Sequence, residues 1–535
     1  MTQPSGVGHA VAAGAAAAAP PNERRWWTLA AVCGATFMLL VDVTIVQVAL
    51  PTMQRTLHAS FSDLQWVISA YALTLSALLL TQGSLADRFG RKRVFMAGLA
   101  VFSVASLACG LATSAGLLIA ARAVQGVGGA GMFATGLALI GQDFRGKERG
   151  TAIAAWGATV GGAVAVGPLV GGALTSAFGW PWIFYVNVPI GALTLAVSAW
   201  RMVNMRDPGA KRLDLAGLVT FSGSLFFLVL GLTRGNDDGW SSRPILVYLC
   251  AAALLMLAFV TAELRQERPM FDLSLFRNPG FVGVSIATFG IGAGMFAMFP
   301  YLTLYLQNDL GLSPLQGGLR LLPMTILSFI VPLLVRPLSE RLAPGLVLGS
   351  GFVICAAGVA LMHMIGPQTG FTALVPGFVV AGFGVGIANP AIARIALGVV
   401  APERSGMASG ISNTFRIGGL ATGVSALGAI FEQRLGASLH QHLGHVPAGL
   451  TKAVAAGGLR AAGTLVHGAP AVVTAARASF VTGMQDLFVV GAAAIFGGGL
   501  FATFVRSRDF HQAVWQPPVM PALEPEAEPL PEPAG

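Results

Sequence analysis

The sequence contains few charged residues for its length. Of its 535 residues, 10% are charged and 55% are hydrophobic, whereas about 25% charged residues are typical of a soluble domain. A soluble chain of this length would need more polar surface, and a disordered chain would be much less hydrophobic. This composition excludes both a soluble enzyme and a disordered protein.

Residues that would hold a metal, a disulfide framework or a nucleotide are also scarce. The four cysteines each stand alone in an apolar stretch: Cys33, Cys109, Cys250 and Cys355. Three histidines have the spacing of metal ligands but no acidic or cysteine partner: His440, His442 and His445. His363 is a single histidine near a helix end. There is no glycine-rich phosphate loop followed by Lys-Ser/Thr. We therefore expect no metal, no cofactor and no ATP site.

Long uncharged runs separate the few charges. Trp66–Ala86, Val94–Ala121 and Leu215–Thr233 contain no Asp, Glu, Lys or Arg, and a membrane-spanning helix needs about 20 apolar residues. Gly150–Trp200 and Leu342–Ala393 are each long enough for two spans and a turn. With the segments that a single charge interrupts, these runs predict an all-α membrane protein with fourteen transmembrane helices. The alternation of barrel strands over about ten residues is absent.

Basic residues are distributed unevenly between the two sides of these helices. With the N-terminus inside, about two thirds of the 32 Lys and Arg fall in segments on the cytoplasmic side. Because basic loops favour that side, we expect both termini in the cytoplasm and the helices in the cell (inner) membrane. The net charge of +9 is then a property of these loops, and no nucleic-acid partner is expected.

Two short matches indicate an internal repeat. Leu85-Ala86-Asp87-Arg88 resembles Leu338-Ser339-Glu340-Arg341, and Glu148-Arg149-x-x-Ala152 resembles Glu403-Arg404-x-x-Met407-Ala408, with nearly the same separation. When the length of two inserted helices is subtracted from this separation, the number of residues that remains is the length of one six-helix half. Parallel six-helix halves with a site between them are typical of secondary transporters.

The predicted organisation follows from this repeat. It comprises a disordered cytoplasmic tail (1–27), a six-helix half (28–200), two inserted helices (201–280), a second six-helix half (281–505) with a long external loop at 432–485, and a second cytoplasmic tail (506–535).

The loop after the second predicted helix combines glycines, one aspartate and several basic residues in the sequence Gly83-Ser84-Leu85-Ala86-Asp87-Arg88-Phe89-Gly90-Arg91-Lys92-Arg93. Glycine permits a tight turn, and an acidic residue at a helix end can face a neighbouring helix N-terminus. We expect Gly83, Asp87, Arg88, Gly90 and Arg91 to gate the conformational change, with Asp87 and Arg91 stabilising one access state. A membrane anchor alone would explain the basic residues but not the glycines and the aspartate.

This loop resembles the signature of the major facilitator superfamily. Three further stretches resemble its fourteen-span drug:proton antiporter branch of the EmrB/QacA type: Leu40–Pro51, Arg122–Gly126 and Gly157–Gly172. Trp180–Pro189 and Gly406–Asn413 are similar to that branch as well. The resemblance covers about residues 28–506 and departs from the family at two positions, where Gln47 replaces the usual Asn and Ala163 replaces a glycine. It implies the major facilitator fold and export of drugs in exchange for protons.

Small residues give the fifth predicted helix a surface that can pack closely. They belong to the stretch that resembles the antiporter motif: Gly157, Gly167, Pro168, Gly171 and Gly172. Small side chains let helices approach, and a proline permits a bend. Close packing between the halves would block proton leak, and the resemblance implies that the motif marks exporters rather than uptake symporters.

A few charged residues fall inside predicted helices. Asp42 and Arg122 lie at similar depths, roughly 12 and 9 Å from the outer helix ends, so they can interact directly or through water. A carboxylate this deep costs roughly 2.5–3.5 kcal/mol to insert. We therefore expect Asp42 and Arg122 to couple transport to protons, with a structural ion pair as the alternative. Arg320 and Arg394 lie nearer to helix ends, where their side chains can reach the membrane surface.

Arg416 lies near mid-depth in the thirteenth helix. It can meet an anionic substrate group or a carbonyl cluster, or act only as a structural clamp. The predicted substrate cavity between the halves includes it among eight candidates: Gln47, Trp66, Tyr71, Gln125, Phe296, Phe299, Asn413 and Arg416.

These features favour a secondary transporter over an enzyme or a channel. An enzyme would need clustered acids, histidines or serines, and only one carboxylate is expected deep in the membrane. A channel would need repeated polar rings. We predict a proton-coupled exporter of neutral, monocationic or zwitterionic lipophilic compounds that works by alternating access. A proton symporter, or an exporter of one specific metabolite, is the alternative. The expected partners are the substrate, protons and lipid, with a periplasmic adaptor and an outer-membrane channel if the cell has an outer membrane.

Overall fold

The computed structural model describes residues 22–204, 214–266, 271–339, 341–400, 405–447, 449–465 and 470–505. In these ranges the chain is helical, and fourteen segments are long and apolar enough to cross a membrane. The predicted all-α fold with fourteen spans is therefore confirmed. The predicted tails lie outside the described residues except for 22–27, where the first helix has already begun.

The first half contains six spans. They are α1 (Asn22–Leu57), α2 (Phe61–Phe89), α3 (Arg91–Gly110), α4 (Ala115–Asp143), α5 (Gly146–Phe178), and a sixth made by α6 (Trp182–Tyr185) and α7 (Asn187–Arg201). A capping box in which Ser60 and Asp63 bond each other's backbone N–H starts α2. The early start of α1 has a tertiary cause, because Arg25 Nη1 lies 2.5 Å from Glu148 Oε2 of α5.

The second half also contains six spans. They are formed by α10 (Pro279–Gly294) with η2 (Phe296–Met298), α11 (Phe299–Leu304) and η3 (Tyr305–Asp309), then α12 (Pro314–Ser339), α13 (Pro344–Leu361) with η4 (Met362–Met364), η5 (Phe371–Leu374) with α14 (Val375–Gly398), α15 (Ser405–Leu443), and α17 (Pro470–Leu500) with η7 (Phe501–Phe504). The first of these spans is interrupted by the short turn η2 and ends in η3.

The two inserted helices, α8 (Leu215–Asp238) and α9 (Arg243–Arg265), lead through η1 (Leu273–Arg277) into the second half. Helix α8 packs against α2 of the first half and α15 of the second. The ring of Trp66 lies 6.0 Å from that of Phe226, and Thr233 Oγ1 donates to Ser425 Oγ at 2.8 Å. Helix α8 therefore bridges the seam between the halves.

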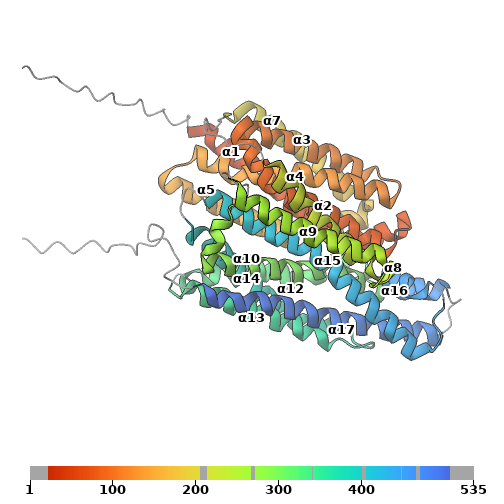
Figure 1. The fold of residues 1–535 in the computed structure, drawn as a ribbon. Helices are drawn as coiled ribbons and strands as arrows, with labels where there is room; N and C mark the ends of the chain where they lie inside the picture. Colours follow the sequence, from red (N-terminus) through yellow and green to blue (C-terminus); the bar gives the residue numbers. More distant parts are fainter. Residues whose placement is uncertain are drawn as a thin grey trace, which may run out of the picture.

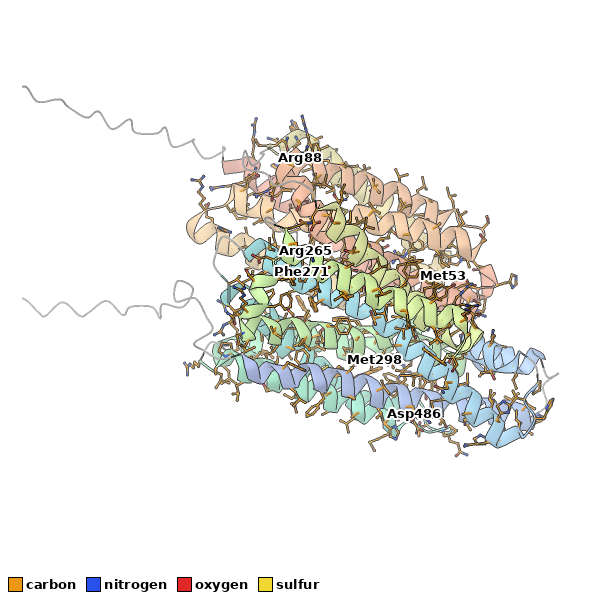
Figure 2. The ribbon with its side chains drawn as sticks, in the orientation of Figure 1. Met53, Arg88, Arg265, Phe271, Met298 and Asp486 are labelled. Carbon is orange, nitrogen blue, oxygen red and sulfur yellow. The ribbon has the colours of Figure 1, made fainter. Side chains whose placement is uncertain are left out.

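The first and last described residues lie at the same end of the bundle, on the left in Figure 1. We call this the terminal end, and the opposite end, where α16 (Leu450–Leu465) lies, the far end. Figure 2 shows Arg88 towards the terminal end and Met53 towards the far end.

The predicted external loop at 432–485 is instead largely helical. Helix α15 continues to Leu443, α16 follows, and α17 begins at Pro470. Charged residues interrupt the apolar pattern here, but they lie on helices that extend past the apolar stretch, where Arg434 Nε is 3.3 Å from Asp486 Oδ2. Length and apolar composition alone therefore underestimated both helices.

Helix α16 covers the far end and joins several elements. It packs against α1, α2, α15, α17 and η3, with Leu450, Val454 and Ala455 fully buried. Lys452 Nζ lies 2.5 Å from Asp237 Oδ1 at the end of α8. Its hydrogen bond to this carboxylate raises the pKa of Lys452, so the Lys452 ammonium stays charged well above neutral pH.

The two halves are joined at the far end. Helix α5 packs on α12, and α2 packs on α15. Four hydrogen bonds connect the halves there. Gln65 Nε2 donates to Tyr301 Oη (3.1 Å) and to Val424 O (3.3 Å), Gln307 Nε2 donates to Val48 O (2.7 Å), and Leu315 N donates to Ser176 Oγ (3.0 Å). These bonds lie towards the far end of the bundle. The structure is therefore closed at the far end.

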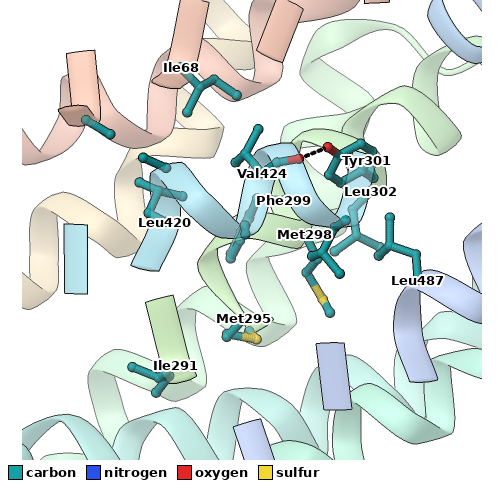
Figure 3. Packing of buried hydrophobic residues seen from close by; sticks show 14 of the residues in the cluster. Ile68, Ile291, Met295, Met298, Phe299, Tyr301, Leu302, Leu420, Val424 and Leu487 are labelled. Carbon is teal, nitrogen blue, oxygen red and sulfur yellow. Dashed lines mark hydrogen bonds between the residues drawn. The ribbon is translucent and has the colours of Figure 1, made fainter. Parts of the chain in front are cut away.

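One apolar cluster supports this closure. It includes Ile68 of α2 in the first half together with Phe299 and Leu420 of the second half. Figure 3 shows these side chains near the hydrogen bond from Tyr301 Oη to the carbonyl oxygen of Val424.

Candidate functional site

Asp42 on α1 and Arg122 on α4 form an ion pair inside the first half. Arg122 Nη1 lies 2.5 Å from Asp42 Oδ2, and the side chains are 2% and 0% exposed respectively. The direct contact that their similar depths allowed is therefore present. Because both charges are removed from water, each depends on the other for compensation.

Neutral amides complete the surroundings of the Asp42 carboxylate. Gln125 Nε2 donates to Asp42 Oδ1 at 2.9 Å, and Asn187 Nδ2 donates to the same oxygen at 3.4 Å. Both amides also donate to Ser106 Oγ, at 3.2 and 3.0 Å. The carboxylate of Asp42 on α1 thus accepts hydrogen bonds from α4 and α7. A change in its charge would therefore alter the bonding between these three helices.

The guanidinium of Arg122 is held from several sides. Its Nε donates to Val67 O at 3.2 Å, and its Nη1 donates to Gln125 Oε1 at 2.8 Å. The ring of Tyr71 lies 4.1 Å from its Cζ and the ring of Phe184 lies 5.8 Å away. Such aromatic faces favour a cation. Tyr71 and Gln125, predicted as cavity residues, therefore belong to the Asp42 site.

Sequence analysis did not assign Asn187 and Ser106 to this site. Asn187 lies in the Trp180–Pro189 stretch that resembles the antiporter branch, and its polar side chain in a long uncharged run was a signal. Ser106 offered no such signal, because a single serine in an apolar helix usually bonds its own backbone. Only the packing of α3 against α4 and α7 brings it to the two amides.

The remaining cavity candidates are dispersed. Gln47 is buried on α1, and its Oε1 has no partner among the described residues. Trp66 packs on α8, as described above, and Phe296 and Phe299 stack with ring centroids 6.4 Å apart. The structure therefore does not gather the eight candidates into one cluster.

Arg416 and Asn413 form a second polar unit, on α15. Arg416 Nη2 donates to Asn413 Oδ1 at 2.5 Å, and Asn413 Nδ2 donates to Ser409 O at 2.9 Å. Both residues are partly buried. No carboxylate in the described part of the chain forms a salt bridge with Arg416.

The family model of the Major Facilitator Superfamily matches residues 32–424. The chain belongs to this superfamily. It is therefore a transporter rather than an enzyme, as the sequence predicted.

Named relatives support the same conclusion over most of the chain. The transporter is 32% identical over 522 residues to the tetracenomycin C resistance and export protein of Streptomyces glaucescens, covering 95% of each chain. It is 36% identical to the multidrug resistance protein Stp of Mycobacterium tuberculosis, covering 76% of each. It is 35% identical to the methylenomycin A resistance protein of Streptomyces coelicolor, covering 74% of this chain and 83% of that protein.

A solved structure shows the same fold. It is a bacterial homologue of the human lysosomal transporter Spinster, described as inward-facing and unoccupied. The likeness covers 93% of this chain and all of that chain, with a TM-score of 0.61 and 18% sequence identity. The transporter thus has the major facilitator fold.

The predicted gating loop is compact and lies at the terminal end. Gly90, with φ of +104°, is the only residue between α2 and α3. Arg91 Nε and Nη2 donate to Asp87 Oδ1 at 3.3 and 3.2 Å, and Arg91 Nη1 donates to Ala138 O of α4 at 3.4 Å. These bonds tie α2, α3 and α4 together within the first half. Arg88 is stacked on Phe89 at 5.4 Å, and Gly83 faces open space.

The antiporter motif divides into packed and open positions. A Cβ atom at Gly171 would lie 2.8 Å from Ile45 Cγ1 of α1, and one at Gly172 would lie 2.5 Å from Pro314 O of α12. Gly167 packs against Thr44, and the carbonyl of Pro168 packs against Gly318 of α12. Gly157, in contrast, has nothing within 4 Å of its Cβ position. The close packing expected for this motif is present in its far-end part and at Gly161, whose Cβ position lies 3.0 Å from the ring of Phe329 of α12, but not at Gly157.

Three carboxyl groups besides Asp42 are buried near helix ends among the described residues: Asp214, Glu263 and Asp309. Glu263 on α9 is 3% exposed, and its Oε2 accepts from Phe271 N at 3.3 Å. Asp309 in η3 is 8% exposed and lies 3.8 Å from Arg477 Nε of α17. Both stand at the ends of apolar runs, where neighbouring segments cover them. Within the described residues, no group of three His, Cys, Asp or Glu could hold a metal ion.

Proposed function

We propose that this transporter exports lipophilic compounds, antibiotics among them, in exchange for protons. The relatives named above are resistance or export proteins for tetracenomycin C, methylenomycin A and multiple drugs. Two further relatives carry the names puromycin resistance protein, from Streptomyces alboniger, and probable actinorhodin transporter, from Streptomyces coelicolor. These names support export of an antibiotic-like compound.

The proposal of proton coupling rests on the buried ion pair of Asp42 and Arg122. Protonation of Asp42 would remove the charge that compensates Arg122 and weaken the charge-assisted bond between α1 and α4. The amides of Gln125 and Asn187 could remain bonded to a neutral carboxyl group, so the site can hold either form. A proton taken up from outside would therefore favour one packing of these helices, and its release inside would favour the other.

The closed far end supports the direction of the cycle. We assign the terminal end to the cytoplasm, in the cell membrane, because the basic residues favour that side. A far end joined by hydrogen bonds and covered by α16 then represents the state that accepts substrate from the cytoplasm. Rocking of the halves around a site between them would expose the substrate to the outside.

The direction of coupling can be tested in proteoliposomes that contain the full chain. We expect an imposed proton gradient to drive a lipophilic drug against the proton flow. The matched control is the same preparation with the gradient collapsed by a protonophore. Drug movement in the same direction as the protons would establish symport and overturn the proposal.

Assembly with a periplasmic adaptor and an outer-membrane channel applies only to a two-membrane envelope. Affinity purification of the full chain from such a host tests this part of the proposal. Recovery of the transporter without these proteins would contradict it.

A further inference from the structure

The two halves differ in how their buried charges are compensated. In the first half, Asp42 and Arg122 compensate each other at 2.5 Å. In the second half, Arg416 forms no salt bridge with a described residue, and its one hydrogen-bond acceptor among them is Asn413 Oδ1. A guanidinium has five N–H donors, so four of those in Arg416 have no acceptor among the described residues.

The neighbours of α15 define the side on which Arg416 lies. Gly410 and Gly428 approach α2, at Leu80 and Gln65. Gly419 and Gly423 approach α10, at Phe289 and Ala293. Ser425 and Ala429 bond to α8, at Thr233 and Asn236. At about 100° per residue, Arg416 and Asn413 lie between the directions of α2 and α10, opposite α8.

This side of α15 is the interior of the bundle. Helix α2 belongs to the first half and α10 to the second, while α8 covers the seam between α2 and α15 from the other side. Leu420, one turn from Arg416 on the same side, is buried in the cluster that joins the halves. Arg416 is thus a cation beside apolar side chains, where the halves meet.

The unbonded nitrogens of Arg416 remain accessible. Arg201 Nε and Arg477 Nε are buried without a hydrogen-bond acceptor, although Arg477 Nε lies 3.8 Å from Asp309 Oδ2, whereas no nitrogen of Arg416 is both buried and unbonded. The bond to Asn413 holds one nitrogen and leaves the other N–H groups free to meet a ligand. An unpaired charge inside a membrane protein is costly to keep and typically marks a substrate or ion pathway.

We infer that Arg416 receives an anionic oxygen of the exported compound, a carboxylate or an ionised phenol, and that Asn413 positions the guanidinium for it. A guanidinium recognises such groups with two parallel hydrogen bonds. A substrate with one anionic group would supply the missing counter-charge, and its apolar body would lie against neighbours such as Leu420. Cations are disfavoured, because Asp42 is already engaged by Arg122. This inference rests on the proposed export function and specifies its substrate class.

The test uses two probes with the same cationic ring system, a rhodamine with a free carboxylate, which is a zwitterion, and its methyl ester, which lacks the anionic oxygen. Binding is measured at equilibrium in nanodiscs, without a proton gradient, for the full chain and for Arg416→Gln and Arg416→Lys. We expect the natural chain to prefer the carboxylate by roughly tenfold or more, Arg416→Gln to lose this preference, and Arg416→Lys to keep part of it.

Arg320→Gln is the matched control. It removes a cation from the same half, but at the far end of α12, where the guanidinium is stacked 4.5 Å from the ring of Phe371. We expect this variant to keep the preference for the carboxylate. Thermal unfolding of each variant verifies that the loss in Arg416→Gln is not a loss of folding.

Two results would overturn the inference. One is a natural chain that binds the carboxylate no better than the ester, including binding of neither. The other is a preference that survives Arg416→Gln. Because these measurements use no gradient, they are independent of the proton-coupled transport in the proposed function. A chain that fails here but still moves a drug against protons would disprove only the substrate class.

Discussion

At the scale of single residues, Asp42 combines full burial with a nearly complete set of donors. Arg122, Gln125 and Asn187 all donate to its carboxylate. This network stabilises the charged form of Asp42. It would also keep a neutral side chain of the same shape in the same position. A substitution that keeps the shape of the side chain can therefore test the role of its proton alone.

The substitution Asp42→Asn is expected to abolish proton-driven export while substrate binding is retained or only weakened. Asparagine has the size of aspartate and can still accept a bond from Arg122, but it cannot titrate. Uphill transport in proteoliposomes should fall to about a hundredth or less, by analogy with loss of a positioned acid–base group. Equilibrium drug binding measured on the same protein separates coupling from recognition.

Asp486→Asn is a suitable control, since Asp486 pairs with Arg434 near the far end and its side chain is 37% exposed. It should leave export near its normal rate. If Asp42→Asn still builds a drug gradient from a proton gradient, Asp42 is not the coupling residue.

At the scale of helices, close approaches hold α5 against one helix of its own half and one helix of the other half. Gly172 meets the backbone of α12, and Gly171 meets α1. These contacts are to backbone or branched side chains, which cannot move aside easily. A larger side chain on this part of α5 must therefore displace a whole helix.

Gly172→Val should reduce export to about a tenth or less, because overpacking a tight contact typically costs about 1–3 kcal/mol. The matched substitution on the same helix is Gly157→Val, where the Cβ position is open. Export rates normalised to protein in the membrane should differ strongly between the two. Equal rates would mean that this approach of α5 to α12 is not needed for transport.

The turn between α2 and α3 supports a second prediction for this scale. Asp87→Asn should weaken the bond to Arg91, which links α2 to α3 and, through Ala138, to α4. We expect slower export, about a tenth of the normal rate or less, with near-normal amounts of protein in the membrane. The loss of a charge-assisted bond is the physical reason. Normal turnover in this variant would exclude a gating role for Asp87.

At the scale of the whole molecule, the hydrogen bonds described above between the two halves lie at the far end. The connection is made by α1, α2 and α5 with η3, α11, α12 and α15, and α16 covers it. A transporter that alternates access must break these bonds in each cycle. A covalent link across the far end should therefore stop the transport cycle.

A cross-link across the far end should stop transport reversibly. Ser176 and Leu315 are joined by a hydrogen bond of 3.0 Å between α5 and α12, so Ser176→Cys with Leu315→Cys places two thiols close together. The four native cysteines are replaced first. We expect oxidation to abolish export and a reductant to restore it, as measured in the same vesicles. Each single cysteine variant serves as the control, and export that continues in the fully cross-linked protein would show that the far end need not open.

Much of the fold could be predicted from the sequence, because membrane insertion depends on features that are local along the chain. Uncharged runs of sufficient length predict helices wherever they occur, and the fourteen spans are present in the structure. Asp42 and Arg122 stood out for the same reason, since a charge within such a run is conspicuous without knowledge of its neighbours. The far-end helices were underestimated, because charged residues can continue a helix beyond the apolar run.

Only the tertiary structure decided which groups meet. Asn187 and Ser106 come to Asp42 because α3, α4 and α7 pack together, and no pattern along the chain specifies that distance. The same is true of the closed far end, of the open surface at Gly157, and of Arg416 without a carboxylate partner. Hydropathy is a property of each segment, whereas hydrogen bonds and ion pairs depend on a few ångströms between residues far apart in sequence. The chain therefore specifies its helices locally and its site through packing.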